Sequence, residues 1–62
     1  MRIILFFKPS DPQWCLRKLL SSVPVRLVEN WGLRALIEAS EDFDPVTIVD
    51  SFDCISRVAV VH

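Results

Sequence analysis

Hydrophobic positions in this 62-residue chain fall into short runs separated by polar and proline-containing segments. The first run, Ile3 to Phe7, is continuous, rich in β-branched and aromatic residues, and therefore apolar on both faces. Such a run predicts a buried central strand over residues 2–7. Pro9 and Pro12 then bracket a turn, in which Asp11 is a good N-cap and Pro12 suits the first position of a helix.

The segment after this turn has a single apolar stripe, which is typical of an amphipathic helix that ends by Pro24. Its apolar positions recur at the helical spacing i, i+3, i+4 and i+7, namely Leu16, Leu19, Leu20 and Val23. The charged residues Arg17 and Lys18 fall on the other side. Val25 to Glu29 has the composition of a second strand.

The segment from Asn30 to Ser40 decides the fold. Its Leu-Arg-Ala-Leu-Ile-Glu-Ala core has high helix propensity, its apolar residues repeat at i, i+3 and i+4, and Asn30 can cap it, so the pattern predicts a second helix. The rest of the chain predicts a polar loop at 41–44, a strand at 46–49 after Pro45, a turn at 50–54 and a last strand at 57–61. The predicted element order is βαβαββ, in one α/β domain that spans residues 1–62.

A pseudo-repeat supports an alternative order. Asp11-Pro12 and Asp44-Pro45 stand 33 residues apart, and Val25–Val28 matches Val58–Val61 at the same offset. On this interpretation the chain is a ferredoxin-like βαββαβ sandwich, in which Gly32 turns a hairpin and Asp44-Pro45 starts the second helix. It requires a strand at LRALIEA and a helix at VTIV, against the local propensity of both segments.

Composition limits the classes of function. A chain this short buries only about 60% of its unfolded surface, yet 52% of its residues are hydrophobic, which favours burial against a protein partner or a second copy. A net charge of −1 argues against a general attraction to nucleic acid. Six of the seven Lys and Arg lie at or before Arg34, and six of the eight Asp and Glu lie between Glu38 and Asp53.

Localisation is predicted from what the sequence lacks. The apolar run after Arg2 is too short for a signal peptide, and no run approaches the ~20 apolar residues that span a bilayer. Two cysteines do not make the disulfide framework of a small secreted domain. We therefore expect a soluble, cytoplasmic protein that contacts neither membrane nor nucleic acid.

With the order βαβαββ, the chain resembles the thioredoxin/glutaredoxin superfamily, closest to short glutaredoxin-like proteins. IILFFKPSDPQWC resembles the first strand and the entry to the redox motif, and Asp44-Pro45-Val46-Thr47-Ile48-Val49-Asp50 resembles the cis-proline segment. The resemblance implies a minimal thioredoxin-like fold without the terminal helix. It also implies a cis Pro45 that shapes a substrate-binding groove, in which Asp44 and Val46 face the active-site cysteine. The C-x-x-C motif of the family is absent: Cys15 matches either its first cysteine, with Lys18 in the second place, or its second cysteine, with Pro12 in the first place.

The resemblance identifies Cys15 as a nucleophile at a helix N-terminus and Lys18 as the stabiliser of its thiolate. Trp14, near the start of the helix, is expected to be exposed and to bind the substrate or partner. Helix N–H groups and nearby cations lower the pKa of a thiol, and a single cysteine allows only monothiol exchange with an external thiol such as glutathione. The opposing interpretation is that Cys15 packs in the core as a small hydrophobe. In the order βαβαββ, Cys54 lies roughly 20 Å or more from Cys15, too far for a disulfide.

Two functions follow. The first is a small glutaredoxin-like thiol protein with no bound cofactor or metal and with glutathione as co-substrate. The second is a non-catalytic interaction or regulatory module that dimerises or binds a partner through an exposed sheet face, presenting either Ile3, Leu5 and Phe7 or the alternate residues Ile4 and Phe6. The acidic residues Glu41, Asp42 and Asp44 are read as a solvated loop.

Overall fold

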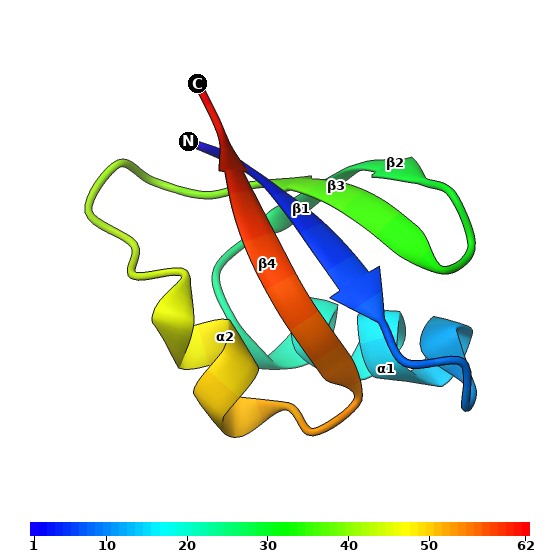
Figure 1. Cartoon of the computed structure of the whole chain (residues 1–62). Helices are drawn as coiled ribbons and strands as arrows, with labels where there is room; N and C mark the ends of the chain where they lie inside the picture. The colour runs from blue at the N-terminus through cyan, green and yellow to red at the C-terminus, as the bar shows by residue number, and fades with distance from the viewer.

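The computed structural model describes all 62 residues and has the element order βαββαβ. Figure 1 shows the arrangement, in which the strands β4 and β1 cross in front of the helix α1. The elements are β1 (Arg2–Phe7), α1 (Pro12–Ser22), β2 (Arg26–Asn30), β3 (Arg34–Glu38), α2 (Val46–Ser51) and β4 (Ile55–Val61). The alternative order is therefore the observed one. The predicted helix over 30–40 and the predicted strand over 46–49 are wrong.

The four strands form one sheet in the order β2-β3-β1-β4, and every neighbouring pair is antiparallel. This strand order combined with the order βαββαβ is that of the ferredoxin-like sandwich, not of a thioredoxin-like domain. The predicted strand at 2–7 is confirmed and lies in the centre of the sheet, as its two apolar faces require.

β3 is a strand because its alternation outweighs its helix propensity. Ala35 and Ile37 are fully buried, whereas Arg34, Leu36 and Glu38 lie on the other face of the sheet. β3 pairs with β1 on one side and β2 on the other, so its backbone groups are satisfied by two ladders. In a helix, Leu33 would have joined the buried stripe, but here it is 53% exposed.

The turn between β2 and β3 is made by Gly32, whose φ of +82° is accessible to glycine without strain. The side-chain oxygen of Asn30 accepts a hydrogen bond from the Gly32 N–H at 3.0 Å. Asn30 therefore stabilises a hairpin rather than capping a helix, as the alternative order requires.

A strand was expected at residues 46–49, but the chain forms α2 there. The start of α2 is capped, and only one of its residues is fully buried. The Asp44 carboxylate accepts a hydrogen bond from the Val46 N–H at 3.1 Å, and Pro45 has helical backbone angles. Ile48 is buried in the core, Val49 is partly buried, and the other residues of α2 are exposed. The chain contains no cis peptide bond, so the expected cis Pro45 is wrong.

α1 confirms the predicted helix. The Asp11 carboxylate accepts a hydrogen bond from the Trp14 N–H at 3.2 Å, and Asp11 itself has a left-handed backbone with φ of 50°. Cys15, Leu16 and Leu19 form the buried stripe. No helix is long and apolar enough to span a membrane.

The core lies on one face of the sheet. Twelve hydrophobic residues are buried, and they join Ile3, Leu5 and Phe7 of β1 to residues from both helices. No helix covers the opposite face, where the alternate residues of the strands lie. We call this second surface the open face.

Candidate interaction surface

The two cysteines form a disulfide, with their Cα atoms 6.1 Å apart. The expectation that Cys54 lies too far from Cys15 is therefore wrong, and the reason is the element order. Both the start of α1 and the segment between α2 and β4 lie at the end of the sheet where β1 finishes, and the Lys8 N–H donates to the Cys54 carbonyl at 2.9 Å. Neither cysteine is free.

The environment of Cys15 is that of a core residue. Its exposed fraction is 0%, whereas Cys54 is partly exposed. The Lys18 ammonium lies over the ring of the exposed Trp14, 5.0 Å from its centroid. The ammonium group that was expected to stabilise a Cys15 thiolate therefore makes a cation–π contact with Trp14.

The other group of predicted site residues lies at the start of α2, which Figure 1 shows apart from the start of α1. Asp44, Pro45 and Val46 follow β3, whose Glu38 is paired with Arg2 at the start of β1. Trp14 and Cys15 follow the end of β1. The structure therefore does not bring the two groups into one groove. Asp44 caps α2, and Val46 is 58% exposed.

The surface carries no pocket, and no group of three His, Cys, Asp or Glu side chains is placed to hold a metal ion. Of the surface features, the open face has the most distinctive chemistry.

The strand register defines the open face, because directly opposed residues of antiparallel strands project on the same side of a sheet. Its middle row is apolar, and charged residues lie at both ends. The members are Arg2, Ile4 and Phe6 of β1, Arg34, Leu36 and Glu38 of β3, Arg57, Ala59 and Val61 of β4, and Arg26 and Glu29 of β2.

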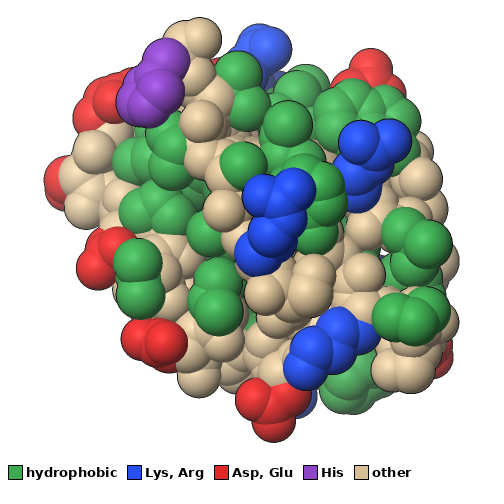
Figure 2. All heavy atoms as spheres, in the orientation of Figure 1, with side chains coloured by type: hydrophobic (Ala, Val, Ile, Leu, Met, Phe, Trp, Pro, Cys, Tyr) green, Lys and Arg blue, Asp and Glu red, His purple; other side chains and the backbone are tan.

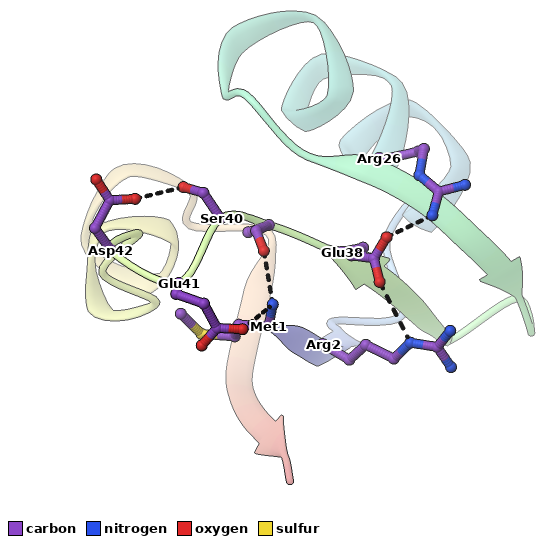
Figure 3. Close-up of polar contacts among 8 residues, drawn as sticks. Met1, Arg2, Arg26, Glu38, Ser40, Glu41 and Asp42 are labelled. Carbon is purple, nitrogen blue, oxygen red and sulfur yellow. Dashed lines mark hydrogen bonds and ion pairs between the residues drawn. The ribbon is translucent and has the colours of Figure 1, made fainter.

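One end of the open face is an ion network (Figure 3). Glu38 accepts from the Arg26 guanidinium at 2.5 Å and lies 3.6 Å from the Arg2 Nε. The hydrogen bond and charge of Arg26, with a smaller contribution from Arg2, lower the pKa of Glu38 below 4.5. The nearby loop also contains a carboxyl with a lowered pKa. The Ser40 hydroxyl donates to Asp42 at 2.6 Å and lowers the pKa of that carboxyl.

The other end of the open face holds arginines without carboxylate partners. The Arg57 guanidinium carbon lies 3.9 Å from the centroid of the Phe6 ring. Neither Arg57 nor Arg34, which lies opposite Phe6 on the other side, takes part in an ion pair within the chain. Both cations are therefore free to attract an anionic group.

Charge is divided between the open face and the rest of the molecule. The open face holds four arginines and two glutamates, while the remaining residues include three Lys or Arg and six Asp or Glu. Figure 2 shows Lys and Arg side chains among hydrophobic ones in the middle of the visible surface, with Asp and Glu toward its periphery. The chain is acidic overall but has a cationic and apolar face.

Sequence reasoning named part of this surface. Ile4 and Phe6 were one of two alternatives for an exposed sheet face, and the burial of Ile3, Leu5 and Phe7 selects them. The four arginines were missed because they are scattered along the chain. A signal existed for one of them, Arg34, because the alternation Arg34-Ala35-Leu36-Ile37-Glu38 places both charges of that segment on one side of a strand.

The chain matches no protein-family model, no curated protein and no solved structure.

Proposed function

We propose that this chain is a non-catalytic interaction domain whose open face binds an acidic segment of another protein. The observation that carries the proposal is the cationic, partly apolar sheet face of a chain whose net charge is −1. An uncovered face with an apolar centre and charged ends has the composition of a protein-binding surface, in which arginine and aromatic residues are enriched.

The apolar row favours a protein segment over nucleic acid. Ile4, Leu36 and Ala59 form the centre, and they gain free energy only from an apolar partner. A single aromatic ring, Phe6, lies on the open face, and Arg57 already covers it, so there is no row of free rings on which bases could stack.

The arginines favour an acidic partner over a face-to-face pair of copies. Each open face holds four arginines and two glutamates, a net charge of +2, so two stacked open faces repel each other. Arg34 and Arg57 have no internal carboxylate to offset that repulsion. An acidic segment with alternating apolar residues supplies carboxylates for these two arginines and an apolar side for Ile4 and Leu36.

Mapping by NMR tests the proposal. The probes are a ten-residue peptide of alternating glutamate and leucine, the matched lysine–leucine peptide, and a single-stranded oligothymidine. We expect the acidic peptide alone to shift the amide resonances of Ile4, Phe6, Leu36 and Arg57, and the shifts to shrink with added salt. Shifts confined to the helices, or binding of oligothymidine in preference to the acidic peptide, would contradict the proposal.

Thiol exchange with glutathione is a second candidate, favoured by the position of Cys15 in the first turn of α1. The thiolate of glutathione would attack the partly exposed sulfur of Cys54, forming a mixed disulfide there and releasing the Cys15 sulfur as a thiolate. That thiolate would be released into the core, where desolvation is unfavourable, so we rank this function second.

Mass spectrometry after incubation in glutathione buffers tests the second candidate. Thiol exchange predicts a chain carrying one glutathione under native conditions. A disulfide that stays intact until the chain is unfolded would exclude exchange and leave the interaction function unaffected.

A further inference from the structure

The two edges of the sheet differ in how they are protected from pairing with another strand. β2 has five residues, of which Arg26, Glu29 and Asn30 are polar and exposed, and its register with β3 is interrupted after Leu27. Short length, charge and irregularity are the means by which sheet edges avoid further pairing. The β2 edge is therefore closed to a new strand.

The β4 edge has none of these features over most of its length. It has seven residues without Pro or Gly, and its irregular register with β1 lies at its start, near Ser56. Its one charged residue, Arg57, is turned over Phe6 on the open face. Val60 and Val61 are 38% and 41% exposed, although both belong to a strand. A long, regular and apolar edge is a template for another strand.

We propose that β4 pairs antiparallel with β4 of a second copy, joining two four-stranded sheets into one across a two-fold axis. The sequence of β4 is compatible with self-pairing in a register centred on Ala59. Val58 then lies opposite Val60, and Arg57 lies opposite Val61 of the other copy. The two arginines are separated by four residues along the strands, about 13 Å, so no like charges meet.

The register also matches the faces of the two sheets. Arg57, Ala59 and Val61 belong to the open face, and Val58 and Val60 lie on the helix side. Centring the pairing on Ala59 keeps both open faces on the same side of the joined sheet. It also brings Val58 of one copy against the exposed Val60 of the other. A register centred on Arg57 instead would oppose two guanidinium groups.

Sedimentation velocity over a range of protein concentration tests this dimer. An edge-to-edge contact is small, so we expect the mass to rise from 7.1 kDa to twice that value as concentration increases from roughly 10 µM to 1 mM. Val60→Lys places a charge on the edge and should raise the dimer dissociation constant by at least about tenfold. The matched control Val46→Lys adds the same charge at an exposed valine of α2 and should leave the constant unchanged.

A second measurement keeps the test decisive if Val60→Lys does not fold. In a mixture of isotope-labelled and unlabelled wild-type chains, the dimer predicts intermolecular contacts between the two copies of Ala59. A wild-type chain that stays monomeric at 1 mM would overturn the proposal. It would also be overturned by a dimer that Leu36→Lys disrupts and Val60→Lys does not, because that pattern indicates stacking of the open faces.

Discussion

Replacing both cysteines by alanine, Cys15→Ala with Cys54→Ala, removes the covalent link between α1 and the segment that follows α2. The disulfide closes a loop with a sequence separation of 39 residues. In the chain-entropy model, a loop of about 40 residues contributes about 4 kcal/mol by restricting the unfolded state. A domain of this length has a total free energy of unfolding of about 3–9 kcal/mol, so the link is a large fraction of it.

The side chains add a smaller contribution. Cys15 is fully buried, and replacing its sulfur by a hydrogen leaves a small void that costs roughly 1 kcal/mol. The double variant should therefore lose about 5 kcal/mol in total. Wild-type protein reduced with a phosphine keeps both side chains and should lose only the part that is due to the covalent link, about 4 kcal/mol.

Equilibrium unfolding in urea, followed by far-ultraviolet circular dichroism, measures both losses. The dependence of the free energy on urea should also steepen, because the unfolded chain without the loop exposes more surface. Equal unfolding midpoints for oxidised and reduced wild-type protein would refute this reasoning. They would mean either that the two sulfurs are not bonded or that the link does not restrict the unfolded chain.

Three further predictions address individual elements. Because Arg26 lowers the pKa of Glu38 below its unfolded value near 4.5, this carboxylate stabilises the fold above that pH, and the contribution is lost as the pH falls. Glu38→Gln removes this contribution, so the melting temperature of the variant should fall less steeply than that of the wild type as the pH is lowered. Asp11→Ala should cost about 1 kcal/mol or more by urea unfolding, whereas Asp11→Asn, which keeps a capping oxygen and tolerates a left-handed backbone, should cost little. Ile37→Ala, at a fully buried residue, should lower the free energy of unfolding by about 2–5 kcal/mol, and Leu33→Ala, at an exposed one, by less than about 1 kcal/mol. A larger loss for Leu33→Ala than for Ile37→Ala would contradict the strand assignment of β3.

The elements that could be predicted from the sequence are those with strong local signals. The continuous apolar run of β1 and the capped, amphipathic α1 are both observed close to their predicted bounds. In each, the propensity of the segment and its place in the fold agree. The strand at 26–30 and the last strand were also expected, within one or two residues at their ends.

The two segments that were assigned wrongly are those in which tertiary structure overrides propensity. Arg34–Glu38 contains good helix formers, but as the strand between β1 and β2 it satisfies two ladders of backbone hydrogen bonds. Val46–Val49 is β-branched, yet a cap from Asp44 and the burial of Ile48 are enough for a short helix. The pseudo-repeat of Asp-Pro pairs predicted the observed strand and the observed helix in these two segments.

The open face could be recognised only if Arg34–Glu38 was assigned as a strand. Once Arg34–Glu38 is a strand, Leu36 and Arg34 lie beside Ile4 and Phe6, and the register of β4 adds Arg57. The disulfide depended on this assignment too, because only the order βαββαβ brings Cys54 to the start of α1. Local sequence could not reveal either feature, since both join segments far apart in the chain.

The most direct test of the proposed interaction surface is the dissociation constant of the glutamate–leucine peptide for two double variants with the same change in charge. Arg34→Glu with Arg57→Glu reverses the free cations of the open face, and Arg17→Glu with Lys18→Glu reverses two exposed cations of α1. If the open face binds the acidic segment, the first pair should raise the constant by about tenfold or more, and the second by less than about twofold. Equal weakening by both pairs would show that net charge alone attracts the peptide, and would contradict the assignment of the open face as the binding surface.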